Sequence, residues 1–436
     1  MNKAKQLIDR LEAQHSLSIE EYEYLIENQS DELAAYAAEK AVALRKQVYG
    51  TDVYIRGLIE IGNICRNDCY YCGIRRSNPA CDRYRLTEAQ ILDCAREGYA
   101  LGFRTFVMQG GEDSAFSADV VCHLVRQIKA EFPDCAVTLS LGEFPREAYQ
   151  AMFDAGADRY LLRHETADKA HYEKLHPAGP KHDYDYHTEA MDRAMDGGID
   201  DVGLGVLFGL EMYKYEFAGL LMHAEHLEAV HGVGPHTISV PRIKRADDID
   251  PDVFDNGLSD ELFAKVIACI RIAVPYTGMI ISTRESQQVR ERALGLGISQ
   301  ISGASRTSVG GYEEEERPHD SEQFDVSDQR SLDEVVNWLM QLGFIPSFCT
   351  ACYREGRTGD RFMSLCKNGQ ILNCCHPNAL MTLAEYLVDY ASEDTKRVGM
   401  ELIQEELKKI PRDKVREIAA EHIKDICSSN RRDFRF

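Results

Sequence analysis

The chain has 436 residues, of which 44% are hydrophobic, and a formal net charge of −22. This acidic balance excludes the concentrated basic surface that nucleic-acid phosphates require, so we expect no nucleic-acid partner. No apolar run reaches membrane-spanning length and the N-terminus lacks the apolar core of a signal peptide, so we expect no membrane partner and a cytoplasmic location. The length fits one barrel with appendages.

The first fifty residues predict a helical segment ahead of the main domain. Helices are expected at residues 3–14, 19–28 and 30–49. Ser18 and Glu21 have the spacing of a capping box at the start of the second helix. Ser30 is placed to cap the third, and Gly50 to end it.

Residues 51–308 alternate between short apolar strands and amphipathic helices. We predict eight strands, at residues 53–61, 104–109, 136–141, 159–164, 201–207, 236–241, 278–283 and 298–303. Helices are expected between them, for example at residues 87–101, 117–131, 185–197, 213–230, 259–273 and 286–295. Strict alternation over this length is typical of an α/β fold of the (β/α)8 TIM barrel type, and an open doubly wound sheet is the alternative.

A Gly- and Glu-rich stretch at residues 310–318 marks the best domain boundary. We predict a linker over residues 309–330, whose acidic run is most simply a solvated segment. Residues 331–436 then form a helical C-terminal domain, with helices at 331–342, 378–392, 394–409 and 412–427. These helices enclose the second of two cysteine clusters.

The 14 cysteines do not suggest disulfides in a chain without an export signal, because the cytosol is reducing. Cys65, Cys69 and Cys72 lie within eight residues. Three thiolates on one loop can hold three irons of a [4Fe–4S] cluster and leave the fourth iron open to a chelating molecule. A zinc knuckle is the alternative, but it needs a fourth ligand. The C-x3-C-x2-C spacing, with Tyr71 before the last cysteine, resembles the radical S-adenosylmethionine (SAM) enzymes.

In a barrel, chemistry belongs to the loops that follow the strands. After strand two comes Gly110-Gly111-Glu112, where glycines allow close backbone approach and a carboxylate can pair with an ammonium group. By itself, the triplet most simply indicates a turn. One strand after the cysteine loop, it resembles the motif with which radical SAM enzymes hold the amino group of SAM.

Further polar groups follow strands three, four and seven. Ser140, Glu143 and Arg163 are predicted to contact SAM, with Glu143 and Arg163 engaging its ribose and carboxylate. A structural ion pair is the alternative, since unpaired buried charges are costly. Ser282 and Arg284 suit the carboxylate of an amino-acid substrate, because a guanidinium group binds a carboxylate in bidentate fashion.

The second cluster contains Cys349, Cys352 and Cys375, which could hold another iron–sulfur cluster with one open iron. The alternative is a zinc ribbon, because two more cysteines, Cys366 and Cys374, are candidates for a further ligand. His236 stands at the start of strand six, at the face opposite SAM. A lone histidine there is more often structural, unless a second metal site lies nearby.

Two families of [FeFe]-hydrogenase maturases share motifs with this chain. From about residue 172 onward it resembles the tyrosine lyase family HydG, in Tyr172-Glu-Lys-Leu-His-Pro177, in residues 234–242 and 274–284, and in Cys349-Thr-Ala-Cys352 followed after 22 residues by Cys375. The front half resembles the sister family HydE instead, in residues 57–68, 139–147 and 157–167. Cys374 and His376 depart from the HydG pattern.

The HydG resemblance implies a (β/α)8 barrel that cleaves tyrosine at Cα–Cβ to p-cresol and dehydroglycine and then forms carbon monoxide and cyanide on an iron for H-cluster assembly. It assigns Cys65, Cys69 and Cys72 to the SAM cluster and Cys349, Cys352 and Cys375 to an auxiliary cluster. His236 would ligate an extra iron, and Ser282 and Arg284 would bind tyrosine.

The implied partners are an electron donor such as ferredoxin or flavodoxin and other hydrogenase maturation proteins. Two alternatives stay open. One is a two-cluster paralogue that acts on another amino acid or on an iron–cysteine complex, and the other is a non-catalytic iron–sulfur carrier.

Overall fold

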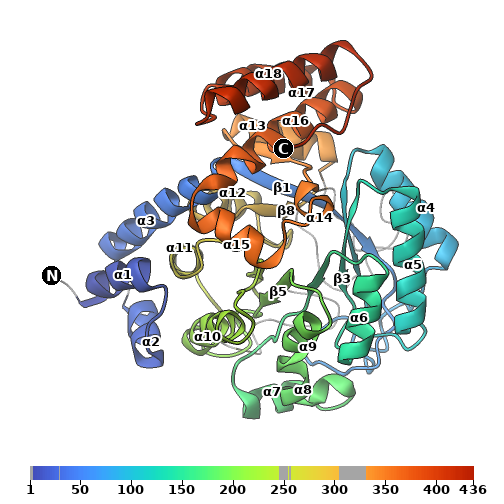
Figure 1. Cartoon of the computed structure of the whole chain (residues 1–436). Coiled ribbons are helices and arrows are strands. Elements are labelled where there is room, and N and C mark those ends of the chain that lie inside the picture. The colour runs from blue at the N-terminus through green and yellow to red at the C-terminus, as the bar shows by residue number, and fades with distance from the viewer. Residues whose placement is uncertain (1–2, 29, 245–253, 255–256, 304–329) are drawn as a thin grey trace.

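The computed structural model describes residues 3–28, 30–244, 254, 257–303 and 330–436. At its centre is a closed parallel barrel of eight strands (Figure 1). The strands are β1 (Asp52–Glu60), β2 (Thr105–Gln109), β3 (Ala136–Ser140), β4 (Arg159–Leu161), β5 (Val202–Gly205), β6 (Thr237–Ser239), β7 (Gly278–Ile280) and β8 (Gln300–Ser302). Because β1 pairs in parallel with both β2 and β8, the sheet closes. The TIM barrel prediction is confirmed.

Helices surround the barrel. They are α4 (Glu88–Ala100), α5 (Ala118–Glu131), α6 (Arg146–Asp154), α7 (Lys169–Leu175), α8 (Tyr184–Thr188), α9 (Ala190–Asp196), α10 (Tyr213–His231), α11 (Asp260–Ala273) and α12 (Gln287–Leu296). Their starts follow local sequence signals: Thr87 and Gln90, for example, form a complete capping box at α4. Helices α6 and α7 were not among those predicted.

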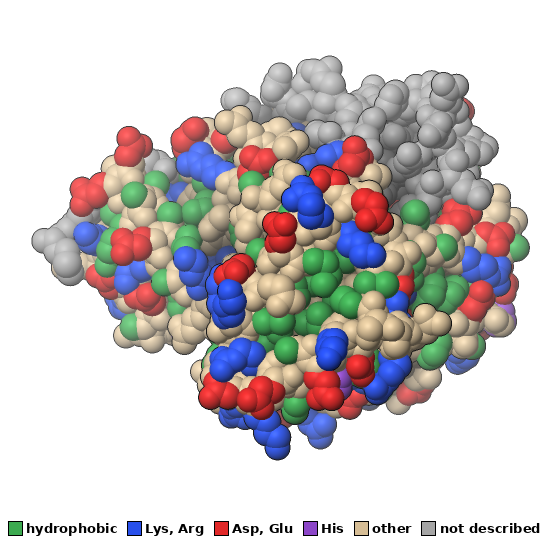
Figure 2. All heavy atoms as spheres, turned by 90° about the horizontal axis from the view of Figure 1, so that it is seen from above, with side chains coloured by type: hydrophobic (Ala, Val, Ile, Leu, Met, Phe, Trp, Pro, Cys, Tyr) green, Lys and Arg blue, Asp and Glu red, His purple; other side chains and the backbone are tan. Residues whose placement is uncertain are grey.

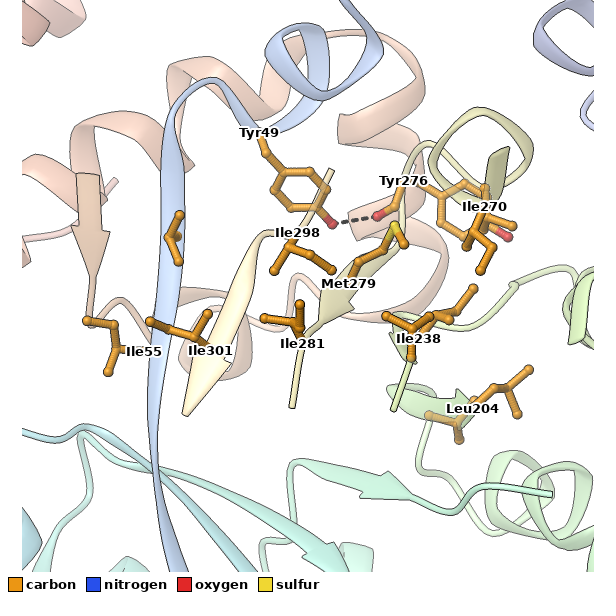
Figure 3. Packing of buried hydrophobic residues seen from close by; sticks show 14 of the residues in the cluster. Tyr49, Ile55, Leu204, Ile238, Ile270, Tyr276, Met279, Ile281, Ile298 and Ile301 are labelled. Carbon is orange, nitrogen blue, oxygen red and sulfur yellow. Dashed lines mark hydrogen bonds between the residues drawn. The ribbon is translucent and has the colours of Figure 1, made fainter. Parts of the chain in front are cut away.

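Apolar side chains from neighbouring strands form the packing layer between barrel and helices. Figure 3 shows Ile55, Ile301, Ile281 and Ile238 in a row across adjacent strands and the segments that extend them. All four are at most 2% exposed. The hydroxyl of Tyr49 donates to the carbonyl of Tyr276 at 2.6 Å, which ties an N-terminal helix to this layer.

The N-terminal helices α1 (Lys3–Gln14), α2 (Ile19–Glu27) and α3 (Asp31–Tyr49) agree with the prediction. They pack on the outside of the barrel, with α3 against α11 (Figure 1). Ser18 and Glu21 form the expected capping box, and Ser30 caps α3. The segment therefore braces one side of the barrel wall.

The C-terminal part adds α13 (Leu332–Gln341), β9 (Ile345–Ser347), α14 (Ala351–Arg354), α15 (Gly359–Lys367), α16 (Cys375–Asp389), α17 (Glu393–Leu407) and α18 (Asp413–Ser428). Strand β9 was not predicted. It pairs with Asp52–Tyr54 of β1, whereas β2 pairs further along with Gly57–Glu60. The ninth strand thus extends the sheet at the N-terminal end of the barrel and carries the second cysteine cluster there.

The predicted linker at 309–330 lies, apart from its last residue, outside the described residues, so the domain boundaries remain predictions. Acidic and basic side chains are interspersed over the face seen from the α16–α18 side, around a central group of hydrophobic side chains (Figure 2). None of the described helices is long and apolar enough to cross a membrane.

Candidate active site

A cavity at the C-terminal mouth of the barrel brings together most of the residues predicted for SAM and substrate. It is lined by Cys65, Cys69, Cys72, Gly110, Gly111, Glu112, Ser140, Arg163, Ser282 and Arg284. They come from the loops and segments that follow β1, β2, β4 and β7, and from the last residue of β3. Parallel strands point their carboxyl ends to the same side, which is why residues so distant in sequence meet here.

The cysteine loop is held against the end of β2 by backbone hydrogen bonds. The amide of Arg66 donates to the carbonyl of Glu112 at 3.1 Å, and the amide of Gly111 donates to that of Gly62 at 2.9 Å. A Cβ on Gly111 would lie 2.3 Å from the carbonyl oxygen of Ile64. Close packing of this backbone on the cysteine loop therefore requires a glycine. The sequence had indicated a different reason, which was close approach of the backbone to a ligand.

The three thiols suit a metal cluster. None of them is in a disulfide. Burial, and then neighbouring Cys72, raise the pKa of Cys65 to about 11, and burial also raises the pKa of Cys69. Bound iron deprotonates such thiols and neutralises the charge that burial disfavours. Among the described residues, no group of three His, Cys, Asp or Glu side chains is arranged to hold a single metal ion.

Glu112 is a suitable partner for an ammonium group. Its Oε2 atom is buried and accepts no hydrogen bond from the described residues, and Nη2 of Arg66 lies 3.9 Å away. Burial and then Glu143 raise the pKa of Glu112. A ligand cation at this oxygen would stabilise the carboxylate, because opposite charge favours the ionised form.

Two guanidinium groups face the cavity near one another. Burial, followed by the charge of Arg163, lowers the pKa of Arg284 to about 9. The amide of Arg284 donates to Oγ of Ser282 at 3.2 Å, which leaves the Ser282 hydroxyl hydrogen for a ligand. Two partly desolvated cations beside a hydroxyl group fit one or more ligand carboxylates.

Glu165 and Lys181 also line this cavity, and the sequence did not assign them a role. Nζ of Lys181 lies 3.0 Å from Oε1 of Glu165, and Nε of Arg163 lies 3.4 Å from Oε2. Burial would raise the pKa of Glu165, but Lys181 and Arg163 lower it well below its usual range. Glu165 has φ +69°, a strained conformation typical of functional sites. The position of Glu165 at the end of strand four could have indicated a site residue from the sequence, whereas no sequence pattern marks Lys181.

Glu143 is not among the residues that line the cavity. It is buried directly after the lining residue Gly142 and is bonded to His187. Its predicted contact with SAM remains a prediction.

A second cavity lies at the opposite, N-terminal end of the barrel. Cys349, Cys352, Cys375 and His236 all line it. Cys349 follows β9 closely, Cys352 is on α14, Cys375 begins α16 and His236 precedes β6. The structure therefore brings together the four residues predicted for the auxiliary iron site.

His236 has the surroundings of a metal ligand. Its Nδ1 accepts a hydrogen bond from Nη2 of Arg159 at 3.0 Å and lies 3.2 Å from Oδ2 of Asp201, which accepts in turn from Arg159 and from the hydroxyl of Tyr353 at 2.8 Å. Its Nε2 is buried and makes no hydrogen bond within the part of the chain that the structure describes. Burial lowers the pKa of His236 to about 4, so the imidazole is neutral at pH 7, as metal ligation requires. Arg159 and Asp201 therefore fix the orientation of the imidazole ring through Nδ1.

The other candidates of the second cluster stand apart from this cavity. Cys366, on α15, is buried but does not line it, and Cys374 is half-buried beside Cys375. Nδ1 of His376 lies 2.8 Å from Oδ1 of Asp52 at the start of β1, where it ties α16 to the barrel. Three thiols and one imidazole therefore form the donor set around the cavity.

Arg56 connects the two cavities, because it lines both. It lies in the middle of β1. Burial, and then the charge of Arg159, lower the pKa of Arg56 to about 9. The Arg56 side chain therefore lies between the two ends of the barrel interior.

Two protein-family models match successive parts of this chain. A model of the Radical SAM superfamily matches residues 59–221, and one of the Biotin and Thiamin Synthesis associated domain matches residues 239–345. The crystal structure of HydG, a maturase of the [FeFe]-hydrogenase, has a TM-score of 0.94 and 42% identity, over 100% of this chain and 95% of that one. The chain belongs to the HydG family. It is a radical SAM enzyme of the HydG type.

Other relatives agree with this assignment. HydG from Carboxydothermus hydrogenoformans has a TM-score of 0.82 and 32% identity, over 96% of this chain and 93% of that one. HydE of Thermotoga maritima is 48% identical over 134 residues, which are 31% of this chain and only 38% of HydE. The 2-iminoacetate synthase of Escherichia coli is 28% identical over 315 residues, 71% of this chain and 81% of that protein. Both resemblances found in the sequence are confirmed.

Proposed function

We propose that this HydG-type enzyme cleaves the Cα–Cβ bond of tyrosine to p-cresol and dehydroglycine, and converts the fragment to carbon monoxide and cyanide on an auxiliary iron for H-cluster assembly. The observation that carries the proposal is the pair of cavities at opposite ends of one barrel, each with three cysteines and joined through Arg56. An enzyme that carried out only the radical cleavage would need only the first cavity.

In the first cavity, Cys65, Cys69 and Cys72 would hold a [4Fe–4S] cluster, and Glu112 and Arg163 would bind the amino and carboxylate groups of SAM. When bound, cluster and SAM supply the 5′-deoxyadenosyl radical that abstracts hydrogen from the substrate. Arg284 and Ser282 orient tyrosine by its carboxylate, which fixes the reacting amine relative to SAM. The buried walls exclude water, which protects reactive fragments.

In the second cavity, Cys349, Cys352 and Cys375 would hold the auxiliary iron–sulfur cluster, and Nε2 of His236 would ligate the extra iron. When bound, that centre would supply an iron able to bind carbon monoxide and cyanide. Arg56 offers an anionic fragment a counter-charge midway between the cavities. The partners implied are tyrosine, a one-electron donor such as ferredoxin or flavodoxin, and other hydrogenase maturation proteins.

An anaerobic assay of the reconstituted enzyme with SAM, dithionite and tyrosine tests the proposal. We expect 5′-deoxyadenosine, p-cresol and carbon monoxide. Cys375→Ala is expected to abolish carbon monoxide and to keep p-cresol, whereas Cys69→Ala is expected to abolish all three products. No p-cresol from a wild-type enzyme that still forms 5′-deoxyadenosine would refute tyrosine cleavage.

A second candidate function is favoured by one observation, the 48% identity to HydE over 134 residues. In that case the two-cluster barrel acts on another amino acid or on an iron–cysteine complex. Formation of 5′-deoxyadenosine with such a substrate and without tyrosine would support it. A non-catalytic carrier has no need of the cavity with Glu112, Arg163 and Arg284, and formation of 5′-deoxyadenosine with any substrate would exclude it.

A further inference from the structure

A buried histidine joins the ends of two barrel strands behind the first cavity. His187, on α8, has a side chain that is 0% exposed. Its Nδ1 is hydrogen-bonded to Oε2 of Glu143, beyond the end of β3, and its Nε2 lies 2.9 Å from the carbonyl oxygen of Arg163, beyond the end of β4. One ring therefore connects two residues expected to contact SAM.

The protonation of this pair follows from its partners. A carbonyl oxygen can only accept a hydrogen bond, so Nε2 of His187 carries a hydrogen. Nδ1 then accepts from a protonated Glu143 or, in the imidazolium form, donates to its carboxylate. In both cases His187 engages Oε2 of Glu143 and leaves Oε1 outside the pair.

One carboxyl oxygen of Glu143 is not bonded to His187. Oε2 is bonded to His187, while Oε1 is buried and has no hydrogen-bond partner among the described residues. A Cβ on the preceding Gly142 would lie 2.4 Å from Cδ of Glu112, so this backbone lies directly against the Glu112 carboxyl group. A buried oxygen without a donor is costly, which indicates that a ligand supplies the donor.

An aromatic stack extends from His187 to the cysteine loop. Its ring centroid is 5.6 Å from that of Tyr172, which stacks on His176 at 3.9 Å. Nε2 of His176 is 2.7 Å from the hydroxyl of Tyr71, the residue before Cys72. The motif at residues 172–177 thus braces the cysteine loop and His187 together.

We propose that His187 is a positioning residue of the SAM site, which fixes the ends of β3 and β4 and holds Glu143 so that Oε1 accepts a hydroxyl group of SAM. This inference rests on the SAM-binding role of Glu143 in the proposed function. Glu143 is the group that touches the ligand, and His187 acts through it.

The test measures the dissociation constant of SAM for the anaerobically reconstituted enzyme. His187→Leu removes both hydrogen bonds and is expected to weaken SAM binding about tenfold or more, with little change in kcat at saturating SAM. His187→Gln keeps an amide donor for Glu143 and is expected to restore most of the affinity. The matched control is His223→Leu, a half-buried histidine whose Nδ1 is bonded to His164 at 3.1 Å, and it should bind SAM like the wild type.

A double-mutant cycle separates positioning from a general loss of structure. In a Glu143→Ala background, His187→Leu is expected to cause no further loss of SAM affinity, because both act through one carboxyl group. If His187→Leu does not fold, His187→Asn, which is too short to reach both partners, takes its place. Independent, additive losses would overturn the inference, as would a His187 variant that binds SAM as tightly as the control.

The outcomes also distinguish this inference from the proposed function. If Glu143→Ala weakens SAM binding and the His187 variants do not, only the role of His187 fails. If Glu143→Ala itself leaves SAM affinity unchanged, the assignment of Glu143 to SAM fails, and the inference fails with it.

Discussion

Arg284 and Arg163 show how single residues shape the first cavity. Both are cations that line the same cavity, and burial together with the charge of Arg163 lowers the pKa of Arg284. Glu165 offsets Arg163 by an ion pair at 3.4 Å. The cavity is therefore prepared for anionic ligand groups, and its affinity for them depends on the shape of each cation as well as on its charge.

Arg284→Lys tests whether the shape of the cation, and not only its charge, determines binding of the substrate carboxylate. An ammonium group keeps the charge but cannot make two parallel hydrogen bonds, so we expect KM for tyrosine to rise about tenfold or more. The measurement is the initial rate of p-cresol formation against tyrosine concentration. SAM affinity serves as the control and should stay within about twofold. An unchanged KM would mean that the carboxylate binds elsewhere.

Glu216 gives a residue-scale prediction for stability. It is buried on α10, and burial raises its pKa from 4.5 to about 8, with smaller contributions from Glu211 and Glu165. The folded chain thus holds a proton that the unfolded chain releases above pH 4.5, so its stability falls as the pH rises from about 4.5 to 8.

Glu216→Gln removes this titration. We expect its melting temperature to match that of the wild type near pH 5 and to exceed it increasingly up to pH 8.5, by a few degrees. Glu173→Gln, at an exposed position on α7, is the control and should show no such trend. A pH-independent difference between Glu216→Gln and the wild type would contradict the assignment.

At the scale of elements, the glycines after β2 determine how closely two loops pack. Gly111→Ala would place a methyl group 2.3 Å from the backbone oxygen of Ile64, which cannot yield as a flexible side chain can. We expect this variant to shift the cysteine loop, to lose iron from the first cluster and to bind SAM poorly. Iron content and SAM affinity are the measurements.

The control for this element is Gly295→Ala within α12. Its Cβ would meet no atom of the described residues within 4 Å, and alanine favours the helix by roughly 0.5–1 kcal/mol. We therefore expect full iron content and a slightly higher melting temperature. If Gly111→Ala behaves like Gly295→Ala, close packing of the loop on β2 is not needed for the cluster.

At the scale of the whole molecule, the barrel separates two reaction sites and joins them through its interior. Arg56→Met removes the charge between the cavities at similar length. We expect p-cresol formation within about twofold of wild type and carbon monoxide formation reduced about tenfold. The reason is that an anionic fragment loses the positive charge of Arg56, which alone among the described residues lines both cavities.

Arg56→Lys keeps the charge and is the matched control, expected to restore most of the carbon monoxide. Product yields per 5′-deoxyadenosine, measured by chromatography and gas analysis, distinguish the two variants. Equal loss of p-cresol and carbon monoxide would place Arg56 in the first cavity alone.

The sequence by itself determined the chemistry of the donors and the type of fold. The spacing of Cys65, Cys69 and Cys72 and the alternation of strands and helices are local patterns, and local patterns can be read without the fold. Because parallel strands end on one side, the order of motifs along the chain also placed Glu112, Arg163 and Arg284 at one mouth.

Only the tertiary structure decided how those groups are supported. His187, Lys181 and Arg56 carry no sequence signal, since their roles depend on contacts with residues far away in the chain. Strand β9 is three residues long, too short for a periodic pattern, yet its pairing with β1 brings Cys349 to the barrel. Long-range contacts, which the sequence does not encode locally, therefore set the geometry in which the readable motifs act.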